Sequence, residues 1–247
     1  MSAAVTGAGP VVAGHQPNFF PWFGYFEKMM MSDIFVFSDD VRYPKQSVVN
    51  GVEIPVGDGT NSWRWSLPVQ HGGDERIADK RYVKDEKQFR KVLRAVEVNL
   101  GGLPHYADVA GLLGEFAEDF WKFDSLADLN IANCTRIARR LGIATETRRG
   151  TELGLEGWRA TERLIRRLQV LGSTVYLSGA GASGYTRPEL FAQAGLELRI
   201  IEYSLGPRLF GPELKYSVLV GIGRLGVASI REAVAAVLAQ RRQGGVP

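Results

Sequence analysis

The sequence predicts an α/β fold in which a Rossmann-like parallel sheet carries an inserted helical subdomain. Short apolar runs typical of buried strands alternate with amphipathic helical patterns at both ends of the chain, as in a parallel sheet flanked by helices. Between these two parts, residues 85–142 show helical patterns only. With 247 residues, 45% of them hydrophobic, the chain is long enough for one large domain. We therefore expect residues 1–247 to form a single domain, with 85–142 as a helical insertion.

The N-terminal part predicts two neighbouring parallel strands followed by a hairpin. One apolar run at Val11–Ala13 leads into Gly-His-Gln-Pro, and a second at Ile34–Phe37 leads into Ser-Asp-Asp, with a helical stretch between them. Further on, alternating apolar residues at 49–55 and 62–69 flank the turn sequence GDGTN, which is typical of a β-hairpin.

Three helices are predicted in the middle of the chain. Asp85 is a suitable N-cap for a helix that runs to about Asn99, and a Gly-Gly-Leu-Pro sequence ends it. A second helical pattern covers 106–121. A third begins at Ser125, where Ser-Leu-Ala-Asp resembles a capping box, and ends at Gly142.

After residue 142 the alternation of strands and helices resumes. Strands are predicted at about 145–148, 174–177 and 198–202. A helix at 158–171 follows the first of them, and a short helix at 188–194 follows the second. The final helix is expected to begin at Ser229, with Glu232 completing a capping box. The helix at 158–171 is amphipathic, with leucines on its inner face. Its outer face is expected to carry four arginines, namely Arg159, Arg163, Arg166 and Arg167.

Composition and charge argue against several classes of protein. The 30 basic and 27 acidic residues are mixed, so the net charge of +3 predicts no concentrated basic face, and nucleic acid is not an expected partner. No secretory signal pattern is present, and no apolar run approaches the roughly 20 residues of a membrane span. The single cysteine, Cys134, excludes an internal disulfide and is expected to pack in the core. We expect a cytoplasmic protein with a small-molecule substrate, which could be linked to a nucleotide or a carrier.

Polar side chains gather where the first two strands end. Loops that follow adjacent parallel strands meet at one crevice, so His15 and Gln16 are expected to face Asp39 and Asp40. His15 is a candidate general acid or base, or a hydrogen-bond donor to an anion; alternatively its nitrogens serve only the loop backbone. The two carboxylates could hold a divalent cation, a ribose or an ammonium group, or share a proton; alternatively one of them caps a turn.

Further polar residues follow in the segment YPKQSVVN. Lys45 could neutralise an anionic substrate or a developing oxyanion, or be an ordinary solvated lysine, and Asn50 is a candidate substrate-binding residue. Lys28, on the first helix, is interpreted as structural. The remaining histidines, His71 and His105, have no metal-ligand spacing, so no metal site is predicted, and no pattern identifies a cofactor.

A glycine-rich turn, Ser-Gly-Ala-Gly-Ala-Ser-Gly-Tyr, follows the strand at 174–177. Its backbone N–H groups and the next helix N-terminus favour an anion, so Ser178, Gly179 and Tyr185 are candidate substrate-binding residues. A sharp chain reversal alone would also require glycines. The turn lacks the lysine of the Walker pattern and the GxGxxG spacing of dinucleotide sites. Glu202, at the end of the next strand, is expected to point into the same crevice.

The opening block of the WbqC-like protein family is similar to the segment HQPNFFPWFGYFEKMMMSDIFVFSDDVRYPKQSVVN. Its other blocks resemble ATERLI, YLSG with the glycine-rich turn, and LFAQAGLEL, so the similarity spans about residues 11–220. The NLGGLPHYADV and GIGRLGVAS stretches depart from the family pattern. The resemblance implies a role in O-antigen sugar or specialised-metabolite biosynthesis. The positions that it implies belong to the family pattern are His15, Gln16, Asp39, Asp40, Lys45, Asn50, Ser178, Gly179 and Tyr185.

Three functional hypotheses follow. The first is a biosynthetic group-transfer enzyme that forms an amide by moving an acyl or aminoacyl group onto an amine. His15 would act as base, and Asp39 or Asp40 would orient it or hold the amine. Lys45 and the Ser178–Gly179 turn would hold anionic parts of the substrate.

The second hypothesis is a nucleotide-dependent ligase or nucleotidyltransferase. It is suggested because a strand, a histidine loop, a helix and a strand ending in Asp resemble the start of the HIGH-type nucleotide-binding superfamily. The third is a non-catalytic scaffold of a biosynthetic complex, with the arginine-rich helix at 158–171 as its contact face.

Overall fold

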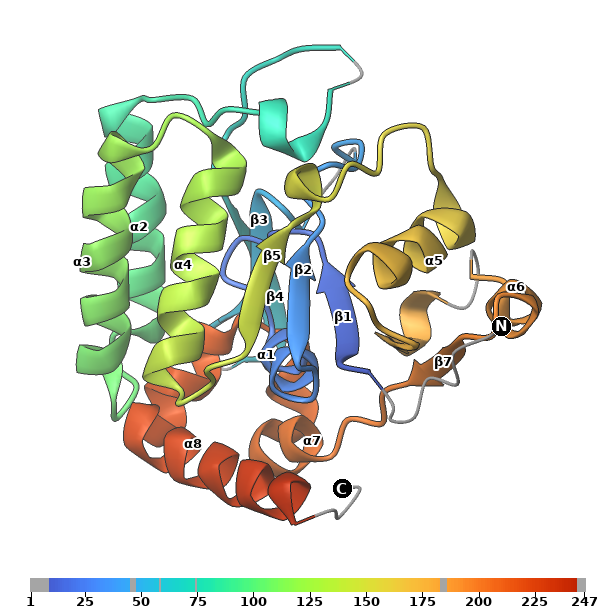
Figure 1. The fold of residues 1–247 in the computed structure, drawn as a ribbon. Coiled ribbons are helices and arrows are strands. Elements are labelled where there is room, and N and C mark those ends of the chain that lie inside the picture. The colour runs from blue at the N-terminus through green and yellow to red at the C-terminus, as the bar shows by residue number, and fades with distance from the viewer. Residues whose placement is uncertain (1–8, 45–47, 58, 74, 183–185, 244–247) are drawn as a thin grey trace.

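The computed structural model of the chain describes residues 9–44, 48–57, 59–73, 75–182 and 186–243. Its centre is a parallel sheet of five strands in the order β5-β2-β1-β6-β7 (Figure 1). The strands are β1 (Val11–His15), β2 (Ile34–Phe37), β5 (Glu146–Arg149), β6 (Val175–Ser178) and β7 (Glu197–Ile200). The α/β fold with a Rossmann-like parallel sheet is therefore confirmed.

The central strands are buried on both faces, and alternate residues separate two apolar cores. Along β1 and β2, Ala13 and Phe35 face the larger core, whereas Val12 and Val36 face the smaller one. Helices α5 (Ala160–Val170) and α6 (Pro188–Gln193) cover the smaller core. The remaining helices gather on the larger core (Figure 1).

The stretch between β2 and β5 contains a hairpin and three helices. The hairpin pairs β3 (Gly51–Val56) with β4 (Asn61–Ser66), and the predicted caps are present: Asp85 accepts from the Gln88 N–H at 2.7 Å, and Ser125 accepts from the Asp128 N–H at 3.3 Å. The three helices are α2 (Glu86–Leu100), α3 (Tyr106–Lys122) and α4 (Leu126–Arg140).

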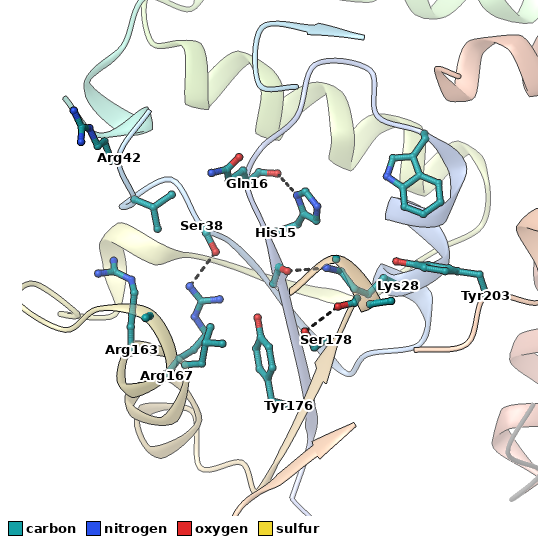
Figure 2. Close-up of a pocket in the computed structure, with 18 residues that line it drawn as sticks. His15, Gln16, Lys28, Ser38, Arg42, Arg163, Arg167, Tyr176, Ser178 and Tyr203 are labelled. Carbon is teal, nitrogen blue, oxygen red and sulfur yellow. Dashed lines mark hydrogen bonds between the residues drawn. The ribbon is translucent and has the colours of Figure 1, made fainter. Parts of the chain in front are cut away.

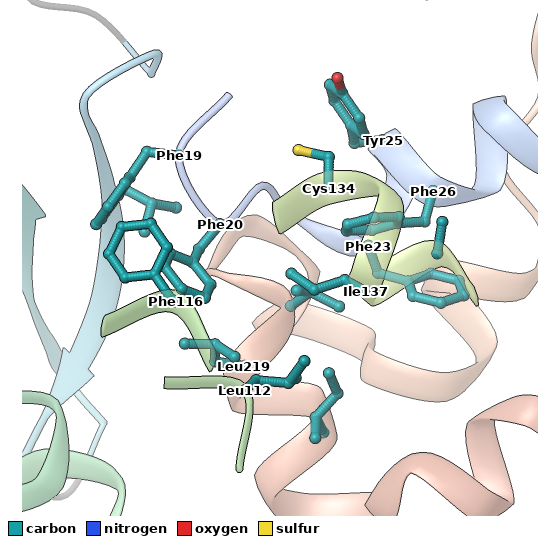
Figure 3. Packing of buried hydrophobic residues seen from close by; sticks show 14 of the residues in the cluster. Phe19, Phe20, Phe23, Tyr25, Phe26, Leu112, Phe116, Cys134, Ile137 and Leu219 are labelled. Atoms are coloured by element: carbon teal, nitrogen blue, oxygen red, sulfur yellow. The ribbon is translucent and has the colours of Figure 1, made fainter. Parts of the chain in front are cut away.

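These middle helices share one core with the sheet. Phe116 of α3 and Ile137 of α4 lie in the same cluster as Phe20 and Phe23, beside α1 (Phe23–Met30) (Figure 3). Cys134 lies fully buried in this core, as predicted, and burial raises the pKa of its thiol to about 12. The thiol is therefore protonated at neutral pH and behaves as an apolar side chain.

The C-terminal helix differs from its prediction. Helix α8 spans Val218–Arg242 and therefore begins before the predicted start at Ser229. It consists of two helical stretches that meet at the non-helical Gly226, and Ser229 lies near the beginning of the second stretch. Ser217 caps its first turn by accepting from the Leu219 N–H at 3.3 Å, and the helix is kinked at Gly226, whose φ is 77°. The first part of this helix is rich in glycine, but Ile222 and its neighbours are buried in the larger core, and this burial outweighs the poor helix propensity of glycine.

A short helix, α7 (Leu205–Phe210), was not predicted. Its N-terminus is held by the buried carboxylate of Glu27, which accepts from the N–H groups of Ser204, Leu205 and Gly206 at 2.7, 2.8 and 2.8 Å. Four short 3₁₀ segments complete the described elements: Ile77–Asp79, Gly150–Glu152, Ala180–Ala182 and Gly211–Lys215. None of the helices in the described ranges has the length and apolar character needed to cross a membrane.

Candidate functional site

A cavity lies at the carboxyl ends of β1 and β6. From β1 the chain builds the sheet toward β2 and β5, and then returns to build it in the other direction through β6 and β7. The β1/β6 boundary is therefore the topological switch point, where open α/β sheets bind their ligands. The cavity has a volume of about 670 Å³ and is lined by these strand ends, the turn after β6, helix α5 and the segment that follows β7 (Figure 2).

Four of the predicted site residues line this cavity together. His15 and Gln16 come from the end of β1, and Ser178 and Gly179 come from the end of β6 (Figure 2). They meet because β1 and β6 are hydrogen-bonded neighbours in parallel register, although more than 150 residues separate them in the chain. The sequence therefore identified two of the strand ends that form the cavity.

His15 is held in one orientation as a neutral imidazole. Its Nδ1 lies 3.3 Å from the Gln16 carbonyl oxygen, which can only accept, so Nδ1 carries the proton and Nε2 keeps a lone pair. Burial, followed by the nearby charge of Lys28, lowers the pKa of His15 to about 3. Tyr25 supports the ring at a centroid distance of 5.0 Å and donates to the same carbonyl at 3.1 Å. His15 is thus suited to accept a hydrogen bond through Nε2 at neutral pH. Because its pKa is about 3, the imidazole is a weak base and does not stay protonated.

Asp39 is engaged in the framework and does not line the cavity. Its buried carboxylate accepts from Arg149 Nε at 2.8 Å and from the N–H and hydroxyl of Thr151 at 2.9 and 3.0 Å. Arg149 also binds Asp128 at 2.6 Å. These contacts tie the end of β2 to the turn after β5, so the carboxylate oxygens of Asp39 are occupied by this chain.

Asp40 also lies outside the cavity wall, but it acts on a residue of that wall. Its carboxylate forms an ion pair with Arg163, which lines the cavity. The carboxylate fits closely over Gly150, where an added Cβ would lie 2.2 Å from Asp40 Oδ1. Asp40 therefore positions Arg163, and the structure does not place the two aspartates face to face with His15.

The other predicted residues are not brought to the cavity. Asn50 donates to the Leu67 carbonyl at 2.9 Å within the hairpin, and Glu202 is exposed and is not part of the cavity lining. Lys45 and Tyr185 lie outside the described residues. Asn50 lies away from the cavity because its side chain links the two chain ends of the β3–β4 hairpin.

Lys28, which the sequence analysis interpreted as structural, lines the cavity. It lines the cavity with only 5% of its surface exposed, and its Nζ donates to the Gly14 carbonyl at 2.9 Å (Figure 2). Burial, followed by the charge of Arg167, lowers the pKa of Lys28 to about 8, so the side chain is mainly cationic at pH 7. A lysine in the last turn of a short helix that is mostly apolar and aromatic was the signal that could have revealed it.

Arg167 corrects the predicted orientation of helix α5. It was expected on the outer face, but it is 1% exposed, lines the cavity and donates to Ser38 Oγ at 2.9 Å (Figure 2). Arg163, one turn earlier, lines the cavity as well, so the face that carries both arginines points toward the strand ends. Gly14 makes this possible, because a Cβ there would lie 2.3 Å from Arg167 Nη1.

The cavity is positively charged. Its lining includes four basic residues, and no acidic residue lines it among those that the structure describes. The described chain also contains no group of three side chains arranged to hold a metal ion. Such a lining favours an anionic ligand over a cationic one. The basic residues are Lys28, Arg42, Arg163 and Arg167.

Comparison with known proteins identifies the family of the chain. Residues 16–209 match the model of the WbqC-like protein family, and this range contains most of the cavity lining. A protein of Mycobacterium tuberculosis named "Uncharacterized protein Rv1507c" is 29% identical over 195 residues, covering 78% of this chain and 82% of the relative. No solved structure matches the chain significantly. The chain therefore belongs to the WbqC-like protein family.

Proposed function

We propose that the protein is a biosynthetic group-transfer enzyme that forms an amide by moving an acyl or aminoacyl group onto an amine. Its setting would be O-antigen sugar or specialised-metabolite biosynthesis in the cytoplasm. One observation carries the proposal: the switch-point cavity combines a hydrogen-bond-accepting imidazole, His15, with the buried cation of Lys28. An acyl transfer needs both an acceptor for the amine N–H and a positive group for the developing oxyanion.

The residues of the cavity have distinct roles in this proposal. His15 Nε2 accepts a hydrogen bond from the attacking amine, and the Lys28 ammonium group stabilises the oxyanion. The C–N bond forms as the bond between the acyl carbon and its leaving group breaks. The amine proton passes through Nε2 to the leaving group, because an imidazole with a pKa of about 3 does not retain it.

A nucleotide-dependent ligase or nucleotidyltransferase is the second candidate. The observation in its favour is the position of the basic cavity at the switch point of a doubly wound sheet, the place where such sheets bind nucleotides. Release of pyrophosphate that depends on ATP and on the acceptor would support this candidate against the first.

The scaffold hypothesis has less support from the geometry. Two of the four arginines assigned to its contact face, Arg163 and Arg167, line the cavity. Arg159, which directly precedes α5, and Arg166 on α5 remain exposed. The basic surface available to a partner on this helix is therefore smaller than the sequence indicated.

Genetic complementation with matched histidine variants tests the proposal. A strain that lacks the gene would receive the native chain, His15→Gln or His71→Gln, and its acylated products would be compared by mass spectrometry. His71 is an exposed histidine outside the cavity lining, so its variant is the matched control. We expect the native chain and His71→Gln to restore the missing product and His15→Gln, at equal protein abundance, to fail. Full restoration by His15→Gln would refute the catalytic role and favour a scaffold.

A further inference from the structure

We propose that the cavity binds a phosphorylated small molecule whose phosphate group lies between Lys28 and Arg167. The inference rests on the proposed function only in taking the cavity as the substrate site, and it adds the chemical class of the substrate.

Lys28 and Arg167 are two buried cations without a carboxylate partner among the described residues. Lys28 donates to the backbone carbonyl of Gly14, and Arg167 donates to the hydroxyl of Ser38 and interacts with the phenol of Tyr176. All of these hydrogen-bond partners are uncharged. The Asp39 carboxylate acts on Arg167 through its charge alone, and its oxygens are bound by Arg149 and Thr151. Burying a charge without a counter-ion is costly, and a fold that holds two such charges against one cavity is stabilised when an anion enters it.

Arg167 retains hydrogen-bonding capacity for such an anion. Its Nε is buried and has no hydrogen-bond partner in the described part of the chain, although the side chain is only 1% exposed and lines the cavity. A guanidinium group presents its N–H groups as a planar fork that matches two oxygens of a phosphate. The absence of a side chain at Gly14 lets this fork lie across the end of β1.

The number of uncompensated charges favours a dianion. The charge of Arg163 is already offset by its ion pair with Asp40. Lys28 and Arg167 both lack an ion-pair partner in the described chain, although the charge of Asp39 also acts on Arg167, and a phosphate monoester with a charge near −2 offers a negative charge to each of the two cations. A carboxylate would neutralise only one of them.

The space around these cations is larger than a phosphate group requires. The volume of about 670 Å³ lies within the range of sites that hold whole metabolites, so an organic part accompanies the phosphate. Trp22 and Tyr203 line the cavity with rings 5.1 Å apart at 64°, and Tyr203 lies on the Lys28 side of the site, away from Arg163 (Figure 2). They provide an apolar wall for that organic part.

Thermal shifts with simple anions test the phosphate subsite. The melting temperature would be measured with sodium phosphate, sulfate or acetate at equal ionic strength, for the native chain, Arg167→Met, Lys28→Met and Arg166→Gln. Arg166 is the matched control, because it is the exposed neighbour of Arg167 on the same helix. We expect phosphate and sulfate, but not acetate, to raise the melting temperature of the native chain and of Arg166→Gln. Both Met variants should bind phosphate at least about tenfold more weakly.

Weaker phosphate binding by the Met variants would not be explained by a loss of folding stability. Replacing a buried, uncompensated cation by a methionine of similar shape removes an electrostatic penalty, so each Met variant should melt at or above the native temperature without added anion. An unchanged phosphate response in Arg167→Met, or an equal response to acetate, would overturn the proposal.

The organic part is tested with glucose 6-phosphate, ribose 5-phosphate and AMP. At least one of these probes should bind about tenfold more tightly than inorganic phosphate, because it fills more of the cavity. If none binds more tightly than inorganic phosphate, the site takes free phosphate and the proposal fails. The complementation assay with His15→Gln is independent of these titrations, so the group-transfer function can stand when the phosphate subsite fails, and the reverse also holds.

Discussion

Replacing Lys28 by methionine should stabilise the protein at neutral pH. The lowering of its pKa from 10.5 to about 8 corresponds to an electrostatic penalty of about 3 kcal/mol at pH 7. The variant removes that penalty and also loses the hydrogen bond to the Gly14 carbonyl, which is worth about 1 kcal/mol. The expected net gain is about 2 kcal/mol in the free energy of unfolding, or about 4–8 °C in melting temperature for a chain of this size.

The gain should depend on pH in a defined direction. The pKa of Lys28 is lower in the folded chain than in the unfolded chain, so the folded state binds fewer protons between about pH 8 and 10.5. The penalty is complete below about pH 8 and is relieved as the pH rises to 10.5. Between pH 7 and pH 9, the advantage of Lys28→Met over the native chain should therefore shrink by about 1 kcal/mol.

Urea unfolding followed by circular dichroism at pH 7 and pH 9 measures both quantities. Lys91→Met is the matched control, because Lys91 is exposed on α2 and its replacement should change stability by less than about 0.5 kcal/mol. A Lys28→Met variant that is less stable than the native chain at pH 7, or whose advantage is the same at both pH values, would refute the electrostatic reasoning.

Three further predictions concern the cations of the cavity. Calorimetry should show sulfate binding about tenfold more weakly at pH 9 than at pH 7, because the protonated fraction of Lys28 falls about tenfold; affinity independent of pH would exclude Lys28 from the anion site. Gly14→Ala should displace the Arg167 guanidinium, since the new Cβ would lie 2.3 Å from Nη1, and should abolish the thermal shift with sulfate; a native-like shift would contradict this geometry. Asp40→Asn should lower the free energy of unfolding, measured in urea, by about 3 kcal/mol, because it removes the ion-pair partner of the mostly buried Arg163. A change below about 1 kcal/mol would show that the pair is effectively solvated.

Local patterns identified most of the elements. The caps at Asp85 and Ser125 and the hairpin turn involve residues within a few positions of one another, so their signals are contained in short windows of sequence. The misplaced start of α8 shows the opposite case. Gly221 and Gly223 disfavour a helix locally, and packing of the residues around Ile222 against distant elements makes the stretch before Gly226 helical.

Part of the candidate site was visible in the same way. His15 and Gln16 lie at the end of one strand and Ser178 lies at the end of another, and the rule that ligands bind at the carboxyl ends of parallel strands is enough to bring them together. Lys28 and Arg167 were missed because helical periodicity does not distinguish a charged residue at the boundary of the apolar face from a solvated one. Whether such a charged side chain is buried at a cavity or solvated depends on where the neighbouring strand ends.

The sequence by itself determined the parallel α/β fold, most of the helix and strand boundaries, and two of the strand ends that form the cavity, because these depend on local periodicity and on strand-end chemistry. Only the tertiary structure decided which charges meet there. Asp39 and Asp40 were expected to face His15, but Arg149 and Arg163 hold them outside the cavity. The physical reason is that charge pairing depends on distances between side chains from different elements, which become defined only when those elements pack. The same packing buries Lys28 and Arg167 beside the cavity without an ion-pair partner in the described chain, and the proposed anion site rests on this arrangement.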